Sequence, residues 1–442
     1  MENNMTQGGI SRALLRFAVP LILSSLFQQL YTLVDSVVVG NCVGEAALAA
    51  IGAASPVSMI FISLVTGLTM GVTILVSQYF GAGEKQRIQK AAGTFVMSLV
   101  ALAAVLSALG IALVRVLLQW THTPADILPD AQCYLWVILL GGPFLTAYNV
   151  YGSLLRGVGD SRTPLYAMIL ATVANIILDL TLVMALGWGV LGVAVATVVA
   201  QLLSALYLVL AVRRRFPLFR FSLRHFSFDR AIFAQGIRLG LPAAIQSSIV
   251  SVGSLLLQNV TNSFGTQTVA AITTAYRIDG IALTSVVNVG SAISTFAAQN
   301  IGAKDEHRAR QGLWRGGIII LATSAAIITV IVCFGATLMR LFGVSEAVAQ
   351  LGRRFLITCS VFYPIFGIQN AFSGFLQGSG DVVVPAASNI ASLLLRIALA
   401  YLMAGPIGFD TIAYAEIASW FLGLAICFIR YGSNRWRGKA VV

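Results

Sequence analysis

The sequence predicts an all-α membrane protein with twelve transmembrane helices in two pseudo-symmetric six-helix bundles. Of its 442 residues, 58% are hydrophobic and only 10% are charged, whereas soluble domains carry about 25% charged residues. The apolar residues form twelve runs long enough to cross a bilayer, which takes about 20 residues. The last six runs repeat sequence patterns of the first six. Because no long segment returns to ordinary polarity, we expect no large soluble domain.

The predicted spans fall into two sets of six. The first set covers 14–39, 47–79, 91–119, 131–156, 163–186 and 190–213, and the second covers 234–263, 268–299, 309–340, 347–376, 382–404 and 409–430. The longest and most basic polar connection separates the sets. We therefore expect an N-lobe at 1–213, a basic cytoplasmic linker at 214–230 and a C-lobe at 231–442. The polar N-terminus leads into a run long enough to span, so we expect no cleaved signal peptide.

The positions of the basic residues indicate the origin of the net charge of +12. Lys and Arg gather in short connections between spans, as they do on the cytoplasmic side of membrane proteins, so we expect no nucleic-acid partner. This pattern predicts a multi-pass protein with both termini in the cytoplasm, and the location we expect for it is the bacterial cytoplasmic membrane. One connection departs from it, because Arg340, Arg353 and Arg354 lie near a predicted outer end.

The two halves share motifs at a nearly constant offset. "NVYGSLLRGVGDSRTP" from Asn149 matches "NAFSGFLQGSGDVVVP" from Asn370, and "SQYFGAGEKQR" matches "AQNIGAKDEHR". Repeats of the same orientation predict lobes related by an axis along the membrane normal, with substrate moving between them. Matched residues are interpreted as architectural. The GxxxG formed by Gly67 and Gly71 is interpreted as a helix-packing face.

Polar residues deep in the first half that lack a counterpart are the first site candidates. They are Asp35, Asn175 and Asp179, whose repeat equivalents are Leu257, Arg396 and Ala400. Asn175 and Asp179 are four residues apart and share one helix face. Asp35 and Asp179 lie roughly 28 Å and 26 Å from the cytoplasmic arginines of their spans, at 1.5 Å per residue. Two acids at one level repel as anions, so the pair can exchange a proton near neutral pH. The alternative is that both are solvated helix-end residues.

Other polar side chains could complete this site. Gln28 and Tyr31 lie along one stripe of the first span with Asp35. Thr197 in the sixth span could join by hydrogen bonding, or could bond only to its own helix backbone. Asn149 lies deeper, but it recurs in the second half, so a structural role is equally open.

The second half carries its own intramembrane charges, Arg277, Asp279 and Arg396. A pair between Asp279 and Arg396, or between Asp279 and Arg277, would neutralise them. Both a structural ion pair and a gating or substrate-facing role remain open for this group.

Several chemistries find no support in the sequence. No GxxxxGK[ST] pattern is present, so no nucleotide-binding engine is expected. The five cysteines form no CxxC pair, which argues against a structural zinc site, and all three histidines fall in predicted loops. We therefore expect a transporter rather than an enzyme, with no cofactor other than a coupling ion.

These motifs together resemble the multidrug and toxic compound extrusion (MATE) transporters, in particular their DinF-like branch. The resemblance covers nearly the whole chain. It rests on P-x7-Q and "LVD" in the first span, "LRGVGD" after the fourth and N-x3-D in the fifth. It implies that Asp35 and Asp179 couple transport to H⁺ or Na⁺, and a sodium ion could bind there. The surrounding polar positions of that branch match Gln28, Asn149, Asn175 and Thr197.

The resemblance also implies a function, namely antiport of organic, cationic compounds by alternating access. The expected partners are small-molecule substrates, the coupling ion and membrane lipids, and the expected state is a monomer. The NorM-type branch carries acids in the seventh and tenth spans. At the corresponding places, near Val250 and Phe366, this sequence has only apolar and small residues. This difference favours ion coupling in the N-lobe alone. The alternative is a lipid-linked precursor flippase of the same superfamily. Such a protein needs a strongly cationic cavity, whereas intramembrane arginine is limited here to Arg115, Arg277 and Arg396.

Overall fold

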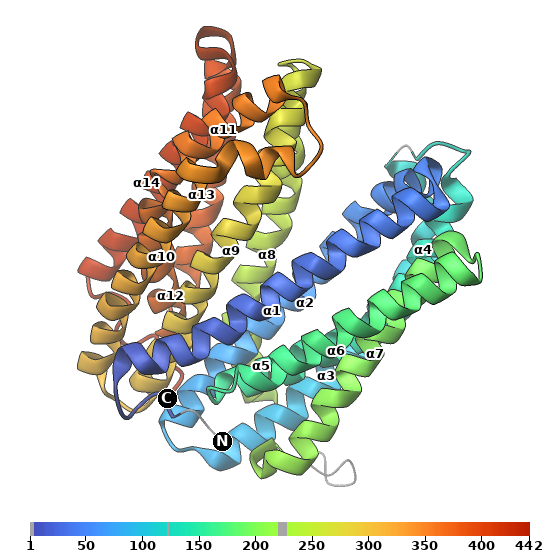
Figure 1. The fold of residues 1–442 in the computed structure, drawn as a ribbon. Helices are drawn as coiled ribbons and strands as arrows, with labels where there is room; N and C mark the ends of the chain where they lie inside the picture. The colour runs from blue at the N-terminus through green and yellow to red at the C-terminus, as the bar shows by residue number, and fades with distance from the viewer. Residues whose placement is uncertain (1–3, 122, 220–227) are drawn as a thin grey trace. The chain divides into compact units, whose positions relative to one another are not determined.

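The computed structural model describes residues 4–121, 123–219 and 228–442, and in these ranges it contains helices and no strand (Figure 1). The helices of the first half are α1 Ile10–Val38, α2 Glu45–Gly81, α3 Lys85–Trp120, α4 Leu128–Leu140, α5 Gly142–Gly157, α6 Arg162–Asp179 and α7 Gly189–Arg215. Those of the second half are α8 Arg230–Asn262, α9 Thr266–Gly302, α10 Glu306–Arg340, α11 Glu346–Ser360, α12 Tyr363–Gly378, α13 Val383–Ile407 and α14 Thr411–Gly432. The basic linker predicted at 214–230 lies partly outside the described residues.

The prediction of twelve spans is confirmed. Within the described residues, nine helical segments are long and apolar enough to cross a membrane, and two bent helix pairs raise the number to eleven. One of the nine, Val383–Gly432, holds both α13 and α14 in 50 residues. This length corresponds to about 75 Å of helix, far more than the roughly 30 Å of a bilayer core, so it supplies two crossings. The chain is a multi-pass integral membrane protein.

The fourth predicted span of each half is broken at the same place. α4 and α5 meet at 42°, and α11 and α12 meet at 48°. A proline lies in the first turn of the second helix of each pair, Pro143 in α5 and Pro364 in α12. Proline lacks an N–H and its ring clashes with the carbonyl four residues earlier, so the preceding helix ends before it. The internal repeat therefore includes the break.

The contacts divide the chain into two units that exchange the starts of their opening helices. The first unit contains Val19–Ala244, and the second contains Asn4–Ala18 with Ile245–Val442. The change of unit falls near Pro20 in α1 and near Pro242 in α8, two prolines 222 residues apart, close to the offset of the shared motifs. The units differ from the predicted lobes, 1–213 and 231–442, by these exchanged segments.

Glycines in α2 explain why the start of α8 belongs to the first unit. A Cβ on Gly67 would lie 2.3 Å from the backbone of Ala244, and one on Gly71 would lie 2.4 Å from the carbonyl oxygen of Gly236. Only glycine permits this approach of two helix backbones. The GxxxG pattern is thus a helix-packing face, as the sequence predicted.

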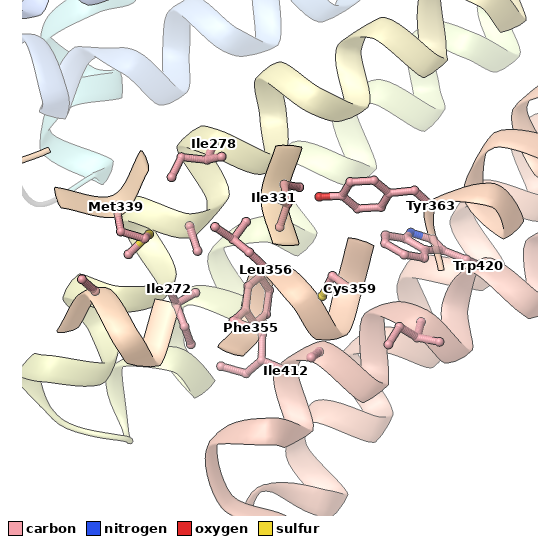
Figure 2. Close-up of a cluster of buried hydrophobic side chains, with 14 residues drawn as sticks. Ile272, Ile278, Ile331, Met339, Phe355, Leu356, Cys359, Tyr363, Ile412 and Trp420 are labelled. Carbon is pink, nitrogen blue, oxygen red and sulfur yellow. The ribbon is translucent and has the colours of Figure 1, made fainter. Parts of the chain in front are cut away.

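The second unit has an apolar core between α9, α10, α11, α12 and α14, drawn in Figure 2. Aromatic rings contribute much of it. The Tyr363 and Trp420 rings lie 6.2 Å apart, and Phe355 packs edge-on against Tyr276 at 5.3 Å. This core surrounds a group of charged side chains described below.

Candidate functional site

α1 and α6 lie side by side in the first unit and bring their acids together. The Thr172 hydroxyl of α6 donates a hydrogen bond to the Phe27 carbonyl of α1 at 3.4 Å. Further along, the carboxyl groups of Asp35 and Asp179 face each other and interact directly. Asp179 has no exposed surface, and Asp35 is partly buried, with its Oδ1 inaccessible. This placement excludes the alternative that both acids are solvated helix ends.

Polar side chains from four helices surround the two acids. The Asn175 amide, fully buried one turn before Asp179, lies beside the Asp35 carboxyl. On the other side, the Tyr31 hydroxyl faces both Asp35 and the Thr197 hydroxyl of α7. Together with Tyr134 of α4, which the sequence analysis did not single out and which faces both acids, these residues form the N-terminal carboxyl cluster: Tyr31, Asp35, Tyr134, Asn175, Asp179 and Thr197.

Much of the hydrogen-bonding capacity of this cluster is unused. Among the described residues, no hydrogen-bond partner of normal geometry reaches Asp35 Oδ1, either oxygen of Asp179, either polar atom of the Asn175 amide, or the Thr197 hydroxyl. A buried polar group left unpaired costs about 1–3 kcal/mol, and a charged group costs more. The cluster contains no Lys or Arg. Its two carboxyls can therefore be satisfied by a bound proton or by a small cation.

Both acid-bearing helices change to π-helix within one turn after their acids. The π segments are Val39–Val43 after α1 and Leu180–Ala185 after α6, and they contact each other. An apolar group that includes Val183 and Val190 packs around them. Wide turns of this kind are frequent at functional sites. Here they cover one end of the N-terminal carboxyl cluster with hydrophobic side chains.

Two predicted site residues lie apart from this cluster. Gln28 is exposed on α1, about 10 Å along the helix from Asp35. The Asn149 amide donates to the carbonyl of Leu145 at 2.9 Å, just as Asn370 in the second unit donates to the carbonyl four residues earlier at 2.8 Å. Among the described contacts, none joins Asn149 to the acids. The geometry matches the structural role that the sequence left open.

The ion pairs expected in the second unit are wrong. Arg396 of α13 pairs with Glu416 of α14 at 2.9 Å, and not with Asp279. Asp279 accepts a hydrogen bond from the Tyr363 hydroxyl instead. Arg277 is exposed. Residues two apart on a helix point in different directions, so the Arg277 side chain does not lie beside Asp279.

Glu416 is the functional candidate that the sequence analysis missed. It occurs in "YAEIASW", a few residues into the twelfth predicted span, where a lone acid resembles a helix end. Its side chain is only 4% exposed. With its neighbours it forms the C-terminal charge cluster: Tyr276, Asp279, Tyr363, Arg396 and Glu416. Buried negative charge therefore occurs in both units, which corrects the expectation that only the N-lobe carries an acidic site.

Comparisons with known proteins bear on both halves. A family model described as MatE matches residues 20–181 and 242–402, one range in each half. The chain is 27% identical to "Probable multidrug resistance protein YpnP" of Bacillus subtilis (strain 168), over 98% of this chain and 97% of the relative. It is 25% identical to "DNA damage-inducible protein F" of Escherichia coli (strain K12), over 81% of this chain and 78% of the relative. A solved outward-facing multidrug resistance MATE family transporter of the MOP superfamily has the same fold, with a TM-score of 0.91, 23% identity and 98% coverage of both chains.

Proposed function

The chain belongs to the MATE family of multidrug efflux transporters, and from this premise we propose that it exports organic cations in exchange for H⁺ or Na⁺. The observation that carries the proposal is the N-terminal carboxyl cluster. Its two acids are close together, Asp179 is buried and Asp35 is partly buried, and among the described residues neither has a basic partner. A bound proton or small cation can neutralise both carboxylates.

The proposed cycle is alternating access driven by occupancy of this cluster. With both acids ionised, the cluster attracts an organic cation, and the rings of Tyr31 and Tyr134 offer faces on which a cation can stack. Uptake of the coupling ion from outside cancels the negative charge, which releases the substrate and permits the inward-facing state. Loss of the ion inside restores the charge. The driving free energy can only be the difference in ion affinity between the two facings.

We also propose an oligomeric state, a location and an orientation for the transporter. It acts as a monomer in the bacterial cytoplasmic membrane with both termini in the cytoplasm. The flippase alternative gains no support, because the Arg396 guanidinium is paired with Glu416 and Asp279 lies nearby. A pyrophosphate group needs free positive charge.

The test is efflux of a cationic dye from proteoliposomes with an imposed pH or sodium gradient. Asp35→Asn and Asp179→Asn each remove one titratable group while keeping side-chain size. We expect gradient-driven efflux to fall by about 5- to 150-fold in each variant, the range of typical coupling free energies. The gradient that drives the wild type identifies the ion.

Asp126→Asn is the matched control, because Asp126 is an exposed carboxylate in the same half. It should transport like the wild type. All variants should elute as a single monodisperse peak in size-exclusion chromatography, which shows that they are folded. Undiminished gradient-driven efflux in both Asp35→Asn and Asp179→Asn contradicts the proposal.

A further inference from the structure

The C-terminal charge cluster contains an odd number of ionisable charges. Two carboxyls, Asp279 and Glu416, are 3% and 4% exposed, and one guanidinium, Arg396 of α13, interacts with both. The Arg396 side chain donates to Glu416 at 2.9 Å and to the Tyr276 hydroxyl at 2.8 Å. Among the described residues, the hydrogen-bond partner of Asp279 is the neutral Tyr363 hydroxyl alone. Fully ionised, the cluster has one uncompensated negative charge.

Within the part of the chain that the structure describes, the surroundings offer no other group to balance this charge. The titratable groups that face Asp279 and Glu416 are Arg396, Tyr276, Tyr363 and Cys359, and all except Arg396 are uncharged at neutral pH. The apolar core of the second unit encloses them, and Figure 2 shows Tyr363 and Trp420 within it. An unpaired ion in such a place costs several kcal/mol.

We propose that the C-terminal charge cluster binds one proton, held by Asp279, so that the second unit contains a proton site of its own. Glu416 remains ionised because Arg396 and Tyr276 both donate to it. The protonated Asp279 keeps one oxygen as acceptor for the Tyr363 hydroxyl. When the proton leaves, Asp279 becomes an anion and competes with Glu416 for Arg396.

This inference deepens the proposed function and rests on it for its role, since a proton released here could add to the coupling in the first unit. The binding of the proton does not depend on transport. Proton binding depends only on the numbers of acidic and basic groups in the cluster. Substitutions that change these numbers should therefore change the number of bound protons.

Three substitutions change the count in different ways. Asp279→Asn and Glu416→Gln each leave one acid with Arg396, so neither variant needs a proton. Glu416→Gln is the more informative variant, because it should abolish proton binding although Glu416 is not the residue that holds the proton. Arg396→Gln leaves two acids and no base, so it should bind two protons.

Infrared difference spectra of the purified full-length protein test these counts, because a protonated carboxylic acid has its own C=O stretching band. The Asp35→Asn/Asp179→Asn double variant is the background, since it silences the N-terminal carboxyl cluster. Between mildly acidic and mildly alkaline pH, we expect one titrating band in this background. It should vanish with Asp279→Asn or Glu416→Gln and become about twice as large with Arg396→Gln.

Asp410→Asn is the matched control, because it removes a carboxylate of the second unit that pairs with the exposed Arg354. It should leave the band unchanged. Tyr363→Phe keeps the number of acids and removes only the hydroxyl that donates to Asp279, so the band should persist at a shifted frequency. This variant keeps the test decisive if a charge substitution prevents folding.

Several results would overturn the inference. No titrating band in the background means that the cluster stays charged. A band that survives Glu416→Gln means that Asp279 titrates independently of the charge count, and a band suppressed by sodium means that the ligand is a metal cation. All of these results are independent of efflux, so failure of the proposed transport cycle and failure of this inference can be told apart.

Discussion

The two polar clusters take their acids from different positions of the repeat, but they share one matched position. In α6 this position is Asn175, and in α13 it is Arg396. An amide beside two acids leaves their charge uncompensated, whereas a guanidinium beside two acids compensates half of it. The residue at this one matched position thus accompanies two different charge balances within the membrane.

The hydrogen bonds follow the same division. Among the described residues, both oxygens of Asp179 and both polar atoms of Asn175 lack hydrogen-bond partners in the first unit, whereas in the second cluster only Arg396 Nε does. In the second unit, Glu416 accepts hydrogen bonds from Arg396 and Tyr276. Buried polar groups are normally paired, so unpaired ones call for an explanation such as an exchangeable ion. This difference is why we assign the main coupling site to the first unit.

The largest effect on stability should come from removing the guanidinium of the second cluster. Arg396→Leu leaves Asp279 and Glu416 without a cation, and breaking a buried pair in this way costs about 3–5 kcal/mol. Denaturant unfolding in micelles measures the loss. It should shrink as the pH is lowered, because the two acids can then be protonated.

Arg354→Leu is the control for this prediction. It breaks an ion pair with Asp410 in which the Arg354 side chain is 64% exposed, and exposed pairs contribute only about 0–1 kcal/mol. Equal losses of stability in the two variants would mean that Arg396 is not compensating buried charge, and the contrast between the clusters would fail.

The sequence predicted the first cluster better than the second for a physical reason. Asp35, Asn175 and Asp179 emerged because comparison of the halves separates shared architecture from exceptions, and helix periodicity places Asn175 beside Asp179. The partner of Arg396 depends on which helices are neighbours in space. α13 packs closely against α14, so Glu416 reaches Arg396, and no spacing within one helix reveals this.

The repeat also explains what the sequence did and did not reveal about the fold. Twelve apolar runs and shared motifs predicted the spans and their pseudo-symmetry. The exchange of Asn4–Ala18 and of the first turns of α8 between units depends on tertiary contacts such as Gly67 against Ala244. Tyr134 was missed because an aromatic residue in a membrane helix is usually interpreted as packing.

A smaller effect is expected from Tyr134→Phe, which tests whether the first cluster uses this ring as more than packing. Its hydroxyl faces both Asp35 and Asp179. Loss of one hydrogen-bonding group is worth about 0.5–1.5 kcal/mol, which corresponds to a roughly 2- to 12-fold decrease in gradient-driven efflux. Tyr166→Phe, which alters an exposed tyrosine of α6 in the same unit, should leave efflux unchanged. If both variants transport like the wild type, Tyr134 is not part of the site.

The smallest effect should come from the asparagines that the two units share. Asn149→Ala and Asn370→Ala each remove one bond from an amide to a carbonyl of the same helix, which should cost at most about 0.5–1 kcal/mol of unfolding free energy. The two losses should be equal, because the bonds are equivalent, and the ratio of efflux with a gradient to efflux without one should not change. A fall in that ratio for Asn149→Ala alone would show that Asn149, although matched in both units, takes part in ion coupling in the first unit. The division between matched residues as architecture and unmatched residues as site would then have to be redrawn.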